Sequence, residues 1–306
     1  MRTPRQAPRL VADPGEIGAV PQAAFLIAPD PADLFRARAR RLAALAAGNP
    51  FAPFLEFVAA LAWAQDAAVA QAPPLPPRAT AEEAEIGPLL GRGAILAAGD
   101  WRESLRLLAA RLDAGAMPEA AVDALRTLAA RPAAETAEFA DRVLDRRFAA
   151  AQAAEAVFLM AALQVCWTRR AGAISPSLVR PRATPACPLC GAAAVASRVG
   201  AAGERHGLRF LACSLCAAEW HYVRIKCTAC GGTKGIDYRA IDGDAGPAKA
   251  EACSECRAYS KIVYAEKDAA AEPFADDLGS LALDVLMADD GWRRAYPNPF
   301  LVSGIA

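Results

Sequence analysis

The sequence contains only two histidines, His206 and His221, and this scarcity narrows the catalytic chemistry that we expect. Histidine is the side chain that most often moves protons near neutral pH, and helical histidine pairs hold catalytic zinc. No helical histidine pair, no serine, histidine and aspartate arrangement and no paired-carboxylate motif is recognisable in the sequence. We therefore expect that the protein is not an enzyme and that it has no catalytic residues.

The chain also lacks a net charge, because its 34 basic residues equal its 34 acidic ones. Proteins that bind nucleic acid gain much of their affinity from basic surfaces, so a balanced chain disfavours a nucleic-acid partner. A local basic excess exists between residues 197 and 240, with seven basic and three acidic side chains. A ribbon that presents Trp220, Tyr222, Arg224 and Lys226 to nucleic acid therefore stays open as the least favoured function.

No hydrophobic run in the sequence is long enough to predict a membrane span. The longest dense apolar stretch, Ala153 to Trp167, contains Glu155 and Gln164 and is too short to cross a bilayer. The basic residues from Met1 to Arg5 are not followed by the apolar segment of an export signal. We therefore expect a cytoplasmic protein that does not insert into a membrane.

Cysteine, by contrast, is present in a regular pattern. Eight of the nine cysteines form four Cys-x-x-Cys pairs, and 22 residues separate the two pairs of each half. Every cysteine of the first half recurs 40 residues later, which indicates an internal repeat of one small module. The eight residues are Cys187, Cys190, Cys213, Cys216, Cys227, Cys230, Cys253 and Cys256.

This spacing is typical of a metal site in which four thiolates surround one ion as a tetrahedron. Gly191 and Gly231 follow the second cysteine of the first pair in each module, where a tight turn needs a positive φ. Disulfides are disfavoured because thiols in the cytoplasm are kept reduced. We expect two ions, the first held by residues 187–216 and the second by residues 227–256. Pairing of the first with the third Cys-x-x-Cys motif remains an alternative.

Helical periodicity predicts an all-α domain over residues 1–180, after an irregular lead-in of about 30 residues. The proline-rich run 73–77 is interpreted as a connector between helices. The segment 153–170 is apolar on nearly all sides, which indicates a helix in the centre of a bundle. The other expected helices cover residues 31–48, 54–72, 101–113, 118–130 and 136–148.

Alternating patterns replace helical ones after residue 180 and predict strands at 208–212, 220–226, 236–241 and 258–264. The expected fold is therefore an α+β multidomain protein, with two tandem rubredoxin-like or zinc-ribbon modules at residues 181–224 and 225–270. Residues 271–306 are expected to form a C-terminal helix, over 274–290, and a tail. Such small modules depend on the metal for much of their folding free energy.

Three other features are given ordinary structural interpretations. His221 is placed on a strand surface and not among the ligands, since eight cysteines already fill two shells. Gly231 to Gly235 lacks the spacing of a phosphate loop, and Cys166 is expected to be a core residue. The acidic excess at residues 241–290, with twelve acidic and four basic side chains, indicates solvated surface or, with the basic region, a docking face for a protein.

Several motifs together resemble the bacterial formate dehydrogenase accessory protein family, FdhE. The cysteine motifs include Cys187-Pro-Leu-Cys190-Gly191 and Lys226-Cys227-Thr-Ala-Cys230. The remaining motifs are Cys213-Ser-Leu-Cys216, Glu219-Trp220-His221, Lys249-Ala-Glu251-Ala-Cys253-Ser-Glu-Cys256, Tyr259-Ser-Lys261-Ile262, Ala275-Asp276-Asp277-Leu278 and Asn298-Pro299-Phe300-Leu301. The helical region is similar to that of the family in arrangement more than in motif.

The resemblance implies a cytoplasmic assembly factor that is needed for the activity of respiratory formate dehydrogenases. It also implies that the protein binds the catalytic subunit before that subunit is exported. The family's Cys-x-x-Cys motifs are associated with rubredoxin-like iron binding, so two four-cysteine metal sites are expected, with iron favoured and zinc as the alternative. An iron-based electron carrier remains the main competing function.

Overall fold

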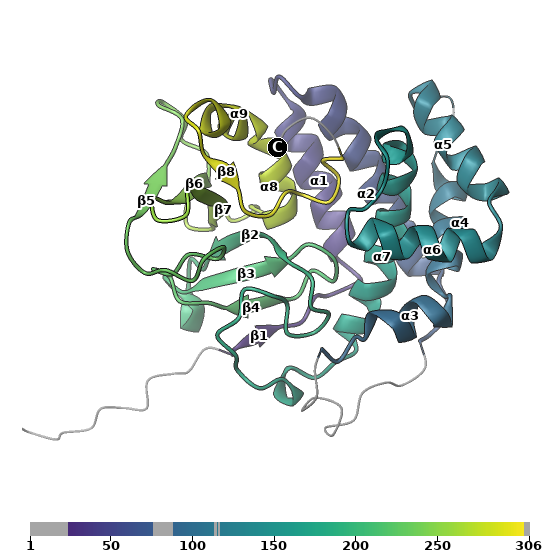
Figure 1. Cartoon of the computed structure of the whole chain (residues 1–306), viewed down its shortest axis with the longest axis horizontal. Coiled ribbons are helices and arrows are strands. Elements are labelled where there is room, and N and C mark those ends of the chain that lie inside the picture. The colour runs from purple at the N-terminus through teal and green to yellow at the C-terminus, as the bar shows by residue number, and fades with distance from the viewer. Residues whose placement is uncertain (1–23, 76–87, 113–114, 116, 303–306) are drawn as a thin grey trace, which may run out of the picture.

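The computed structural model describes residues 24–75, 88–112, 115 and 117–302. The N-terminal helices gather on one side and a mixed sheet, with the C-terminal helices against it, lies on the other, and Figure 1 shows the two halves packed side by side. This confirms the expected combination of an N-terminal helical region with a C-terminal region that contains strands and two cysteine groups. The first 23 residues of the predicted lead-in and residues 76–77 of the predicted connector lie outside the described residues.

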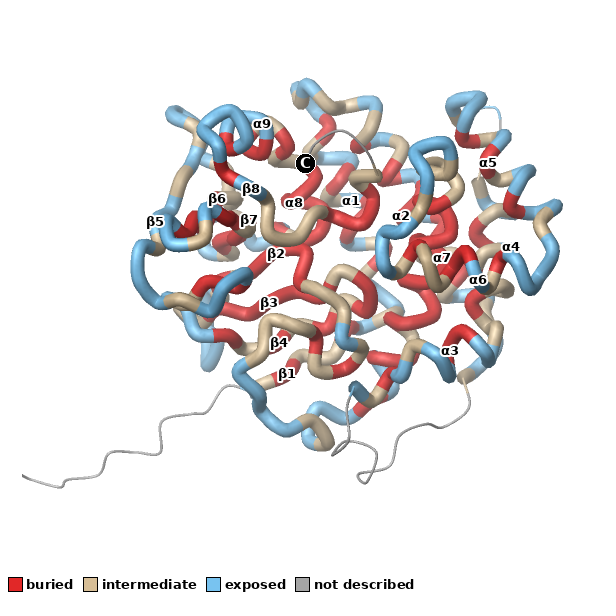
Figure 2. Tube along the Cα trace, in the orientation of Figure 1, coloured by how far each residue is buried: buried red, intermediate tan, exposed pale blue. Residues whose placement is uncertain are grey.

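The helical half is built around α7 (Ala153–Gly172), which contacts α2, α4, α5 and α6. Every residue from Ala156 to Thr168 is buried, and Figure 2 shows this burial along the helix. Within the described residues, α7 with the short turn before it is the one helix long and apolar enough to cross a membrane. Because most of it is packed against protein, it has the property of a core helix, as the sequence predicted.

The other helices of this half are close to their predicted positions, with small shifts at their ends. A short helix, α3, was not predicted, because seven residues carry too little periodicity. The helices are α1 (Leu34–Ala46), α2 (Ala52–Gln71), α3 (Arg92–Ala98), α4 (Trp101–Arg111), α5 (Glu119–Ala130) and α6 (Ala133–Leu144).

The strands of both cysteine modules form one sheet in the order β1-β4-β3-β2-β7-β6-β5, and β8 pairs with β7. The junction is the parallel pairing of β2 with β7, in which Ser197 lies opposite Ile262. The two tandem modules are therefore joined in one sheet, a connection that the sequence did not predict. The strands are β1 (Leu26–Ile27), β2 (Ala194–Val199), β3 (Arg209–Cys213), β4 (Glu219–His221), β5 (Ile236–Arg239), β6 (Ala248–Cys253), β7 (Ala258–Tyr264) and β8 (Arg293–Arg294).

Strand β4 ends at His221, five residues before the predicted end at Lys226. The guanidinium group of Arg209 donates to the backbone carbonyl groups of Val223, Arg224 and Lys226, so these carbonyls do not join a sheet ladder. Strand β1, near the N-terminus, pairs with β4. The lead-in that was predicted to be irregular therefore contains a short strand.

The predicted C-terminal helix is two helices, α8 (Pro273–Gly279) and α9 (Leu281–Asp289). The Lys261 ammonium group donates to the carbonyl oxygens of Asp277 and Ser280, at 2.6 and 3.0 Å. These carbonyls lie at the break between the helices, where the backbone at Ser280 leaves the helical conformation. The predicted helix is therefore interrupted at the position where the buried Lys261 of the sheet binds carbonyl groups of the helix end.

The hydrophobic core is continuous from the helices into the first cysteine module. Leu189, Leu215 and Trp220 belong to the same buried cluster as Trp167 of α7. The second module has a small core of its own, in which Tyr259 packs with residues of α9. The two modules are therefore similar in sequence spacing but differ in what supports them.

Candidate metal centres

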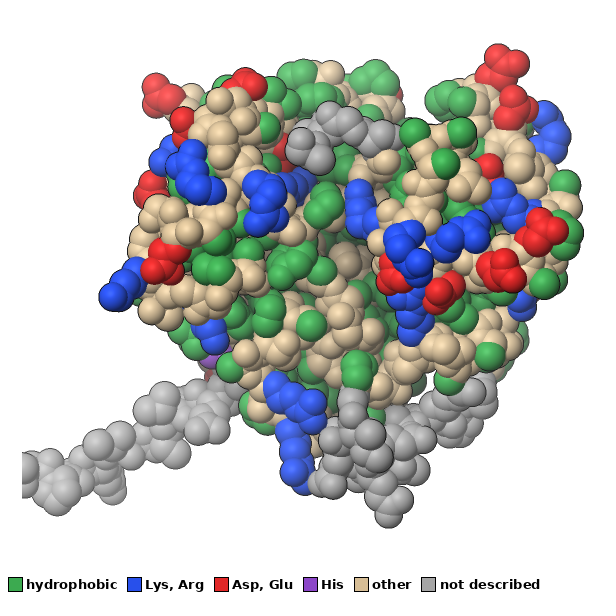
Figure 3. Space-filling model, in the orientation of Figure 1, with side chains coloured by type: hydrophobic (Ala, Val, Ile, Leu, Met, Phe, Trp, Pro, Cys, Tyr) green, Lys and Arg blue, Asp and Glu red, His purple; other side chains and the backbone are tan. Residues whose placement is uncertain are grey.

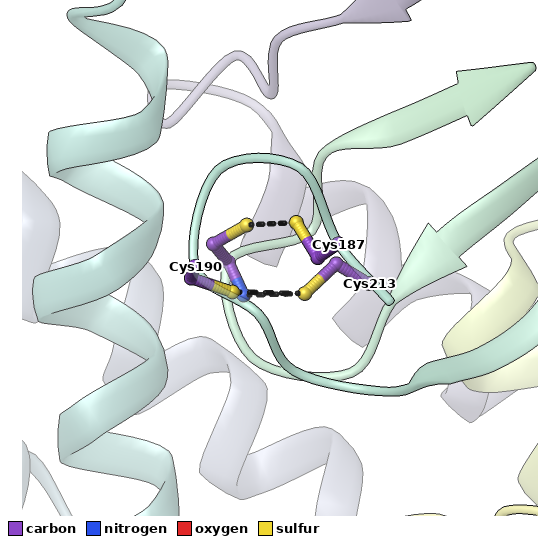
Figure 4. Close-up of side chains that lie close together, drawn as sticks. Cys187, Cys190 and Cys213 are labelled. Atoms are coloured by element: carbon purple, nitrogen blue, oxygen red, sulfur yellow. Dashed lines mark hydrogen bonds between the residues drawn. The ribbon is translucent and has the colours of Figure 1, made fainter. Parts of the chain in front are cut away.

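The first four cysteines come together at the end of the sheet that faces the helices. The Cys187 and Cys216 sulfurs are 3.6 Å apart, and those of Cys190 and Cys213 are 3.4 Å apart. Figure 4 shows the labelled sulfurs of Cys187, Cys190 and Cys213 directed toward one another, from a loop before β2 and the end of β3. Of the four residues, only Cys190 is partly exposed.

The last four cysteines form a second group, from the loop before β5 and the turn between β6 and β7. The Cys227 and Cys256 sulfurs are 3.7 Å apart, and those of Cys230 and Cys253 are 3.8 Å apart. Cys230 is exposed and Cys256 is half-buried, whereas the other two are buried. The second group therefore lies closer to solvent than the first.

The geometry of both groups fits a tetrahedral thiolate site. A metal–sulfur distance of 2.3 Å places neighbouring sulfurs of a tetrahedron roughly 3.8 Å apart. The ligand atoms of each group all lie within 4.8 Å of one another, and all eight cysteines are free thiols. The grouping is sequential, with the first four cysteines in one group and the last four in the other, and the alternative pairing of first with third motifs is not observed.

A left-handed residue follows each of the four Cys-x-x-Cys turns. Gly191 and Gly231 have φ angles of 78° and 75°, as the sequence predicted. The equivalent positions in the other two turns are Ala217 and Arg257, with φ angles of 59° and 55°. Because side chains other than glycine rarely take this conformation, nothing in the residue types indicated that all four turns share one geometry.

Backbone amides point at the sulfurs inside these turns. Leu215 and Cys216 donate from their N–H groups to the Cys213 sulfur at 3.4 Å, and Gly232 donates to the Cys230 sulfur at 3.4 Å. Such donors stabilise thiolate relative to thiol, which is the form that binds metal. The Gly231 to Gly235 loop thus contributes an amide to the cysteine turn.

The electrostatics of the first group favour an uneven distribution of protons among its thiols. Burial alone would raise the pKa of Cys213, but hydrogen bonds from Cys187, Cys190 and Cys216 lower it well below its ordinary value. Burial raises the pKa of Cys190 and Cys216 well above theirs. Four thiols so close together cannot all ionise without a cation, and the arrangement is suited to a metal ion that replaces their protons.

The first group is attached to the helical half by polar contacts as well as by the shared core. Gln164 of α7 donates from Nε2 to the carbonyl oxygen of Ser214 at 2.8 Å, and Gln65 of α2 donates to Gln164 Oε1 at 3.0 Å. The amide of Leu90 donates to the carbonyl oxygen of Leu189 at 2.8 Å. Both turns of the first group are thus held by contacts from the helical half, one from α7 and one from the bend before α3.

Residues outside the two groups fill the structural positions expected of them. His221 is half-buried on β4 and contacts the Phe210 ring edge to face, with ring centres 5.9 Å apart. It belongs to neither cysteine group. Cys166 is buried in α7, and burial raises its pKa to about 12. This agrees with the prediction that Cys166 is a core residue.

A buried charge cluster that the sequence did not predict lies behind the second module. Lys261 of β7 lies against Asp277 and Asp284, and Arg294 pairs with both carboxylates. The side chains of Lys261, Asp277 and Asp284 are at most 1% exposed, and the Tyr259 hydroxyl donates to Asp284 at 2.7 Å. The sequence contained an indication of this cluster. Lys261 shares one face of a predicted strand with Tyr259 and Val263, which places a charged residue between two large side chains.

The fold and these two groups define a class of proteins in which a helical domain is joined to a pair of rubredoxin-like or zinc-ribbon modules, each with four cysteines. Models described as "FdhE, N-terminal", "FdhE, central domain" and "FdhE, C-terminal domain" match residues 23–184, 186–224 and 225–301. The chain belongs to the FdhE family.

Relatives and a solved structure cover nearly the whole chain. The "Protein FdhE homolog" of Rhizobium meliloti is 36% identical over 95% of this chain and 97% of its own length. That of Stutzerimonas stutzeri is 38% identical over 96% of this chain and 98% of its own length. The crystal structure of the FdhE protein from Pseudomonas aeruginosa is similar, with a TM-score of 0.83 and 36% identity, over 92% of this chain and 99% of that one.

Proposed function

We propose that this protein is a cytoplasmic accessory factor for respiratory formate dehydrogenase, which binds the catalytic subunit and is needed for its activity. The observation that carries the proposal is membership of the FdhE family over almost the entire chain, including both four-cysteine groups. A helical half joined to metal-supported ribbons offers docking surfaces of fixed shape, which suits a factor that holds another protein during its assembly.

We assign the role of metal ligands to the eight cysteines of the two groups, with one ion in each and iron favoured over zinc. Bound metal supplies a cross-link between the two turns of a module, while the amides directed at the sulfurs stabilise the thiolates. Four protein ligands leave no open position for a substrate, so the sites are proposed as structural and the protein as a non-enzyme.

Electron transfer is a second candidate, and the exposure of Cys230 favours it. A thiolate-bound iron near solvent can exchange one electron with a partner, whereas the first group is more deeply buried. A visible spectrum, with metal analysis of protein purified without oxygen, separates the candidates. An absorption band that bleaches on reduction, at about two irons per chain, supports iron. Two zinc ions and no colour would remove the electron-transfer candidate.

The main test is genetic and biochemical. A strain that lacks this protein is expected to lose formate dehydrogenase activity, and expression of the wild-type chain is expected to restore it. A tagged copy should co-purify with the catalytic subunit from the cytoplasmic fraction. Normal activity in the deletion strain would contradict the accessory role, and restored activity without any association would contradict binding of the subunit.

A further inference from the structure

The short segment between the two cysteine groups, residues 223–226, projects from the surface, and we name it the inter-module ridge. Val223 is 54% exposed and Ile225 is 61% exposed, so two large apolar side chains are in solvent one residue apart. Tyr238 of β5, 36% exposed, joins them through a hydrogen bond of 3.4 Å from its hydroxyl to the Arg224 carbonyl oxygen. Exposed apolar groups gathered in this way are typical of interaction surfaces.

The ridge is held in its conformation from below by a buried ion pair. One guanidinium nitrogen of Arg209 donates to the Lys226 carbonyl oxygen at 3.1 Å and lies 3.5 Å from the carbonyl oxygens of Val223 and Arg224. The same nitrogen lies 2.9 Å from a carboxylate oxygen of Glu251, and both side chains are at most 2% exposed. A surface that is fixed before binding loses less conformational entropy when a partner docks.

The side chains of the ridge itself carry charge of one sign, and the Glu255 carboxylate lies beside Gly232 of the neighbouring cysteine turn. Residues 222–235 contain three basic side chains, Arg224, Lys226 and Lys234, and no acidic one. The acidic residue that follows, Asp237, is 3.6 Å from Arg239 and so has a basic neighbour of its own. An apolar centre flanked by Arg224 and Lys226 is complementary to a surface that combines carboxylates with apolar side chains.

The ridge also continues into the second cysteine group. Lys226 lies 5.5 Å from the centre of the Tyr222 ring, and its side chain passes beside Gly231 of the cysteine turn. Cys230, in the same turn, is exposed. A partner seated on the ridge would therefore contact the more exposed of the two cysteine groups.

We propose that the formate dehydrogenase catalytic subunit docks on the inter-module ridge, through a surface of that subunit that carries carboxylates around apolar side chains. This inference rests on the proposed function, since it names the surface through which the accessory factor would hold its partner. Val223 and Ile225 supply the apolar contact, while Arg224 and Lys226 attract the carboxylates and set the orientation.

The test is binding of the purified catalytic subunit to the full-length, metal-loaded protein, measured by biolayer interferometry. Ile225→Asp is expected to weaken binding by about tenfold or more, because it places a carboxylate in the apolar centre. Arg224→Glu is expected to slow association and to reduce the dependence of affinity on salt. The matched control is Leu286→Asp, a change on α9 at a side chain that is 50% exposed. Metal content and the thermal unfolding midpoint of each variant establish that it is folded.

The outcomes separate the two proposals. Weaker binding by Ile225→Asp and Arg224→Glu, with Leu286→Asp equal to wild type, supports the ridge. Wild-type affinity in both ridge variants would contradict docking on the ridge. An equal loss of affinity in all three variants would also contradict it. Neither outcome contradicts the accessory function. If the wild-type protein does not bind the catalytic subunit, the proposed binding function fails and the ridge assignment falls with it.

Discussion

Asp276 and Asp277 are consecutive residues of α8, yet their carboxylates pair with charged groups from two different parts of the fold. Asp276 accepts hydrogen bonds of 3.0 and 2.5 Å from Arg41 of α1, in the helical half. Asp277 pairs with Arg294 and lies 3.7 Å from the Lys261 ammonium group, in the second module. Helix α8 therefore connects α1 with β7 and β8 through buried charges.

Replacing Lys261 with methionine tests this connection. The change leaves the Asp277 and Ser280 carbonyl groups without their buried donor, and it removes a positive charge from between two carboxylates. Breaking a buried pair of this kind costs about 3–5 kcal/mol. We expect the free energy of unfolding, measured with urea by circular dichroism, to fall by about that amount.

The control is Lys267→Met, because Lys267 donates to the Gly246 carbonyl oxygen at 3.3 Å in an exposed position. A surface change of this kind alters stability by about 0.5 kcal/mol or less. Equal effects of the two lysine variants would show that the buried cluster does not stabilise the fold.

The two cysteine groups should differ in what their loss does to the rest of the chain. Cys187→Ser and Cys227→Ser are matched changes, since both residues are buried and each begins its module. Each variant is expected to lose one of two metal equivalents. Only Cys187→Ser should also expose amides of α7 to hydrogen exchange, because Gln164 and the core of α7 contact the first group.

Metal analysis and hydrogen exchange read by mass spectrometry give the two quantities separately. Full metal content in either variant would refute the ligand assignment. Equal exchange in α7 for both variants would show that the first group gives the helices no special support.

Cys166 provides a test of core packing that is independent of the metal sites. The thiol is 1% exposed, and burial raises its pKa to about 12, so it is protonated and inaccessible at pH 8. In the folded, metal-loaded protein we expect no alkylation of Cys166 by iodoacetamide, and complete alkylation in 6 M guanidinium. Peptide mass spectrometry distinguishes it from the other eight cysteines, and rapid labelling of the folded protein would contradict the packing.

The sequence predicted features that depend on local spacing. The repeat of 40 residues predicted which four cysteines share a group, because each turn and its hairpin are local structures. The apolar character of residues 153–170 on nearly all sides predicted α7 and its burial, because composition is likewise a local property. The pairing of β2 with β7 could not be predicted, since contacts between residues such as Ser197 and Ile262 leave no pattern in either segment.

Charged residues misled the sequence analysis where they are buried. One interpretation placed the acidic excess of residues 241–290 in solvated surface, but Glu251, Asp276, Asp277 and Asp284 are buried. Their partners are distant in the chain, as in the pair of Arg209 with Glu251, so no local rule distinguishes them from surface acids. Figure 3 shows that on the face it displays, basic and acidic side chains are intermixed, without a field of one sign.

The stability of the helical half should respond to acid through Asp145. Hydrogen bonds from Arg92 and Arg147 lower the pKa of its carboxyl group from 3.8 to about 2. Because the folded state favours the ionised form, the stabilisation is fully present above about pH 5 and is lost as the pH falls from 4 to 2. The Asp145 side chain is 39% exposed, so we expect only the roughly 0.2–1 kcal/mol of an exposed pair.

Asp145→Asn removes this dependence and keeps the side-chain volume. Above pH 5 the wild-type protein should have the larger free energy of unfolding, and the difference between the two proteins should shrink toward zero near pH 2. Urea titrations at intervals of half a pH unit measure that difference in the free energy of unfolding. Acid affects the cysteine groups of both proteins equally, so this effect cancels in the difference. Asp123→Asn, on an exposed face of α5, controls for the loss of a carboxylate. A difference that stays constant or grows toward low pH would show that Arg92 and Arg147 do not hold Asp145 in its ionised form.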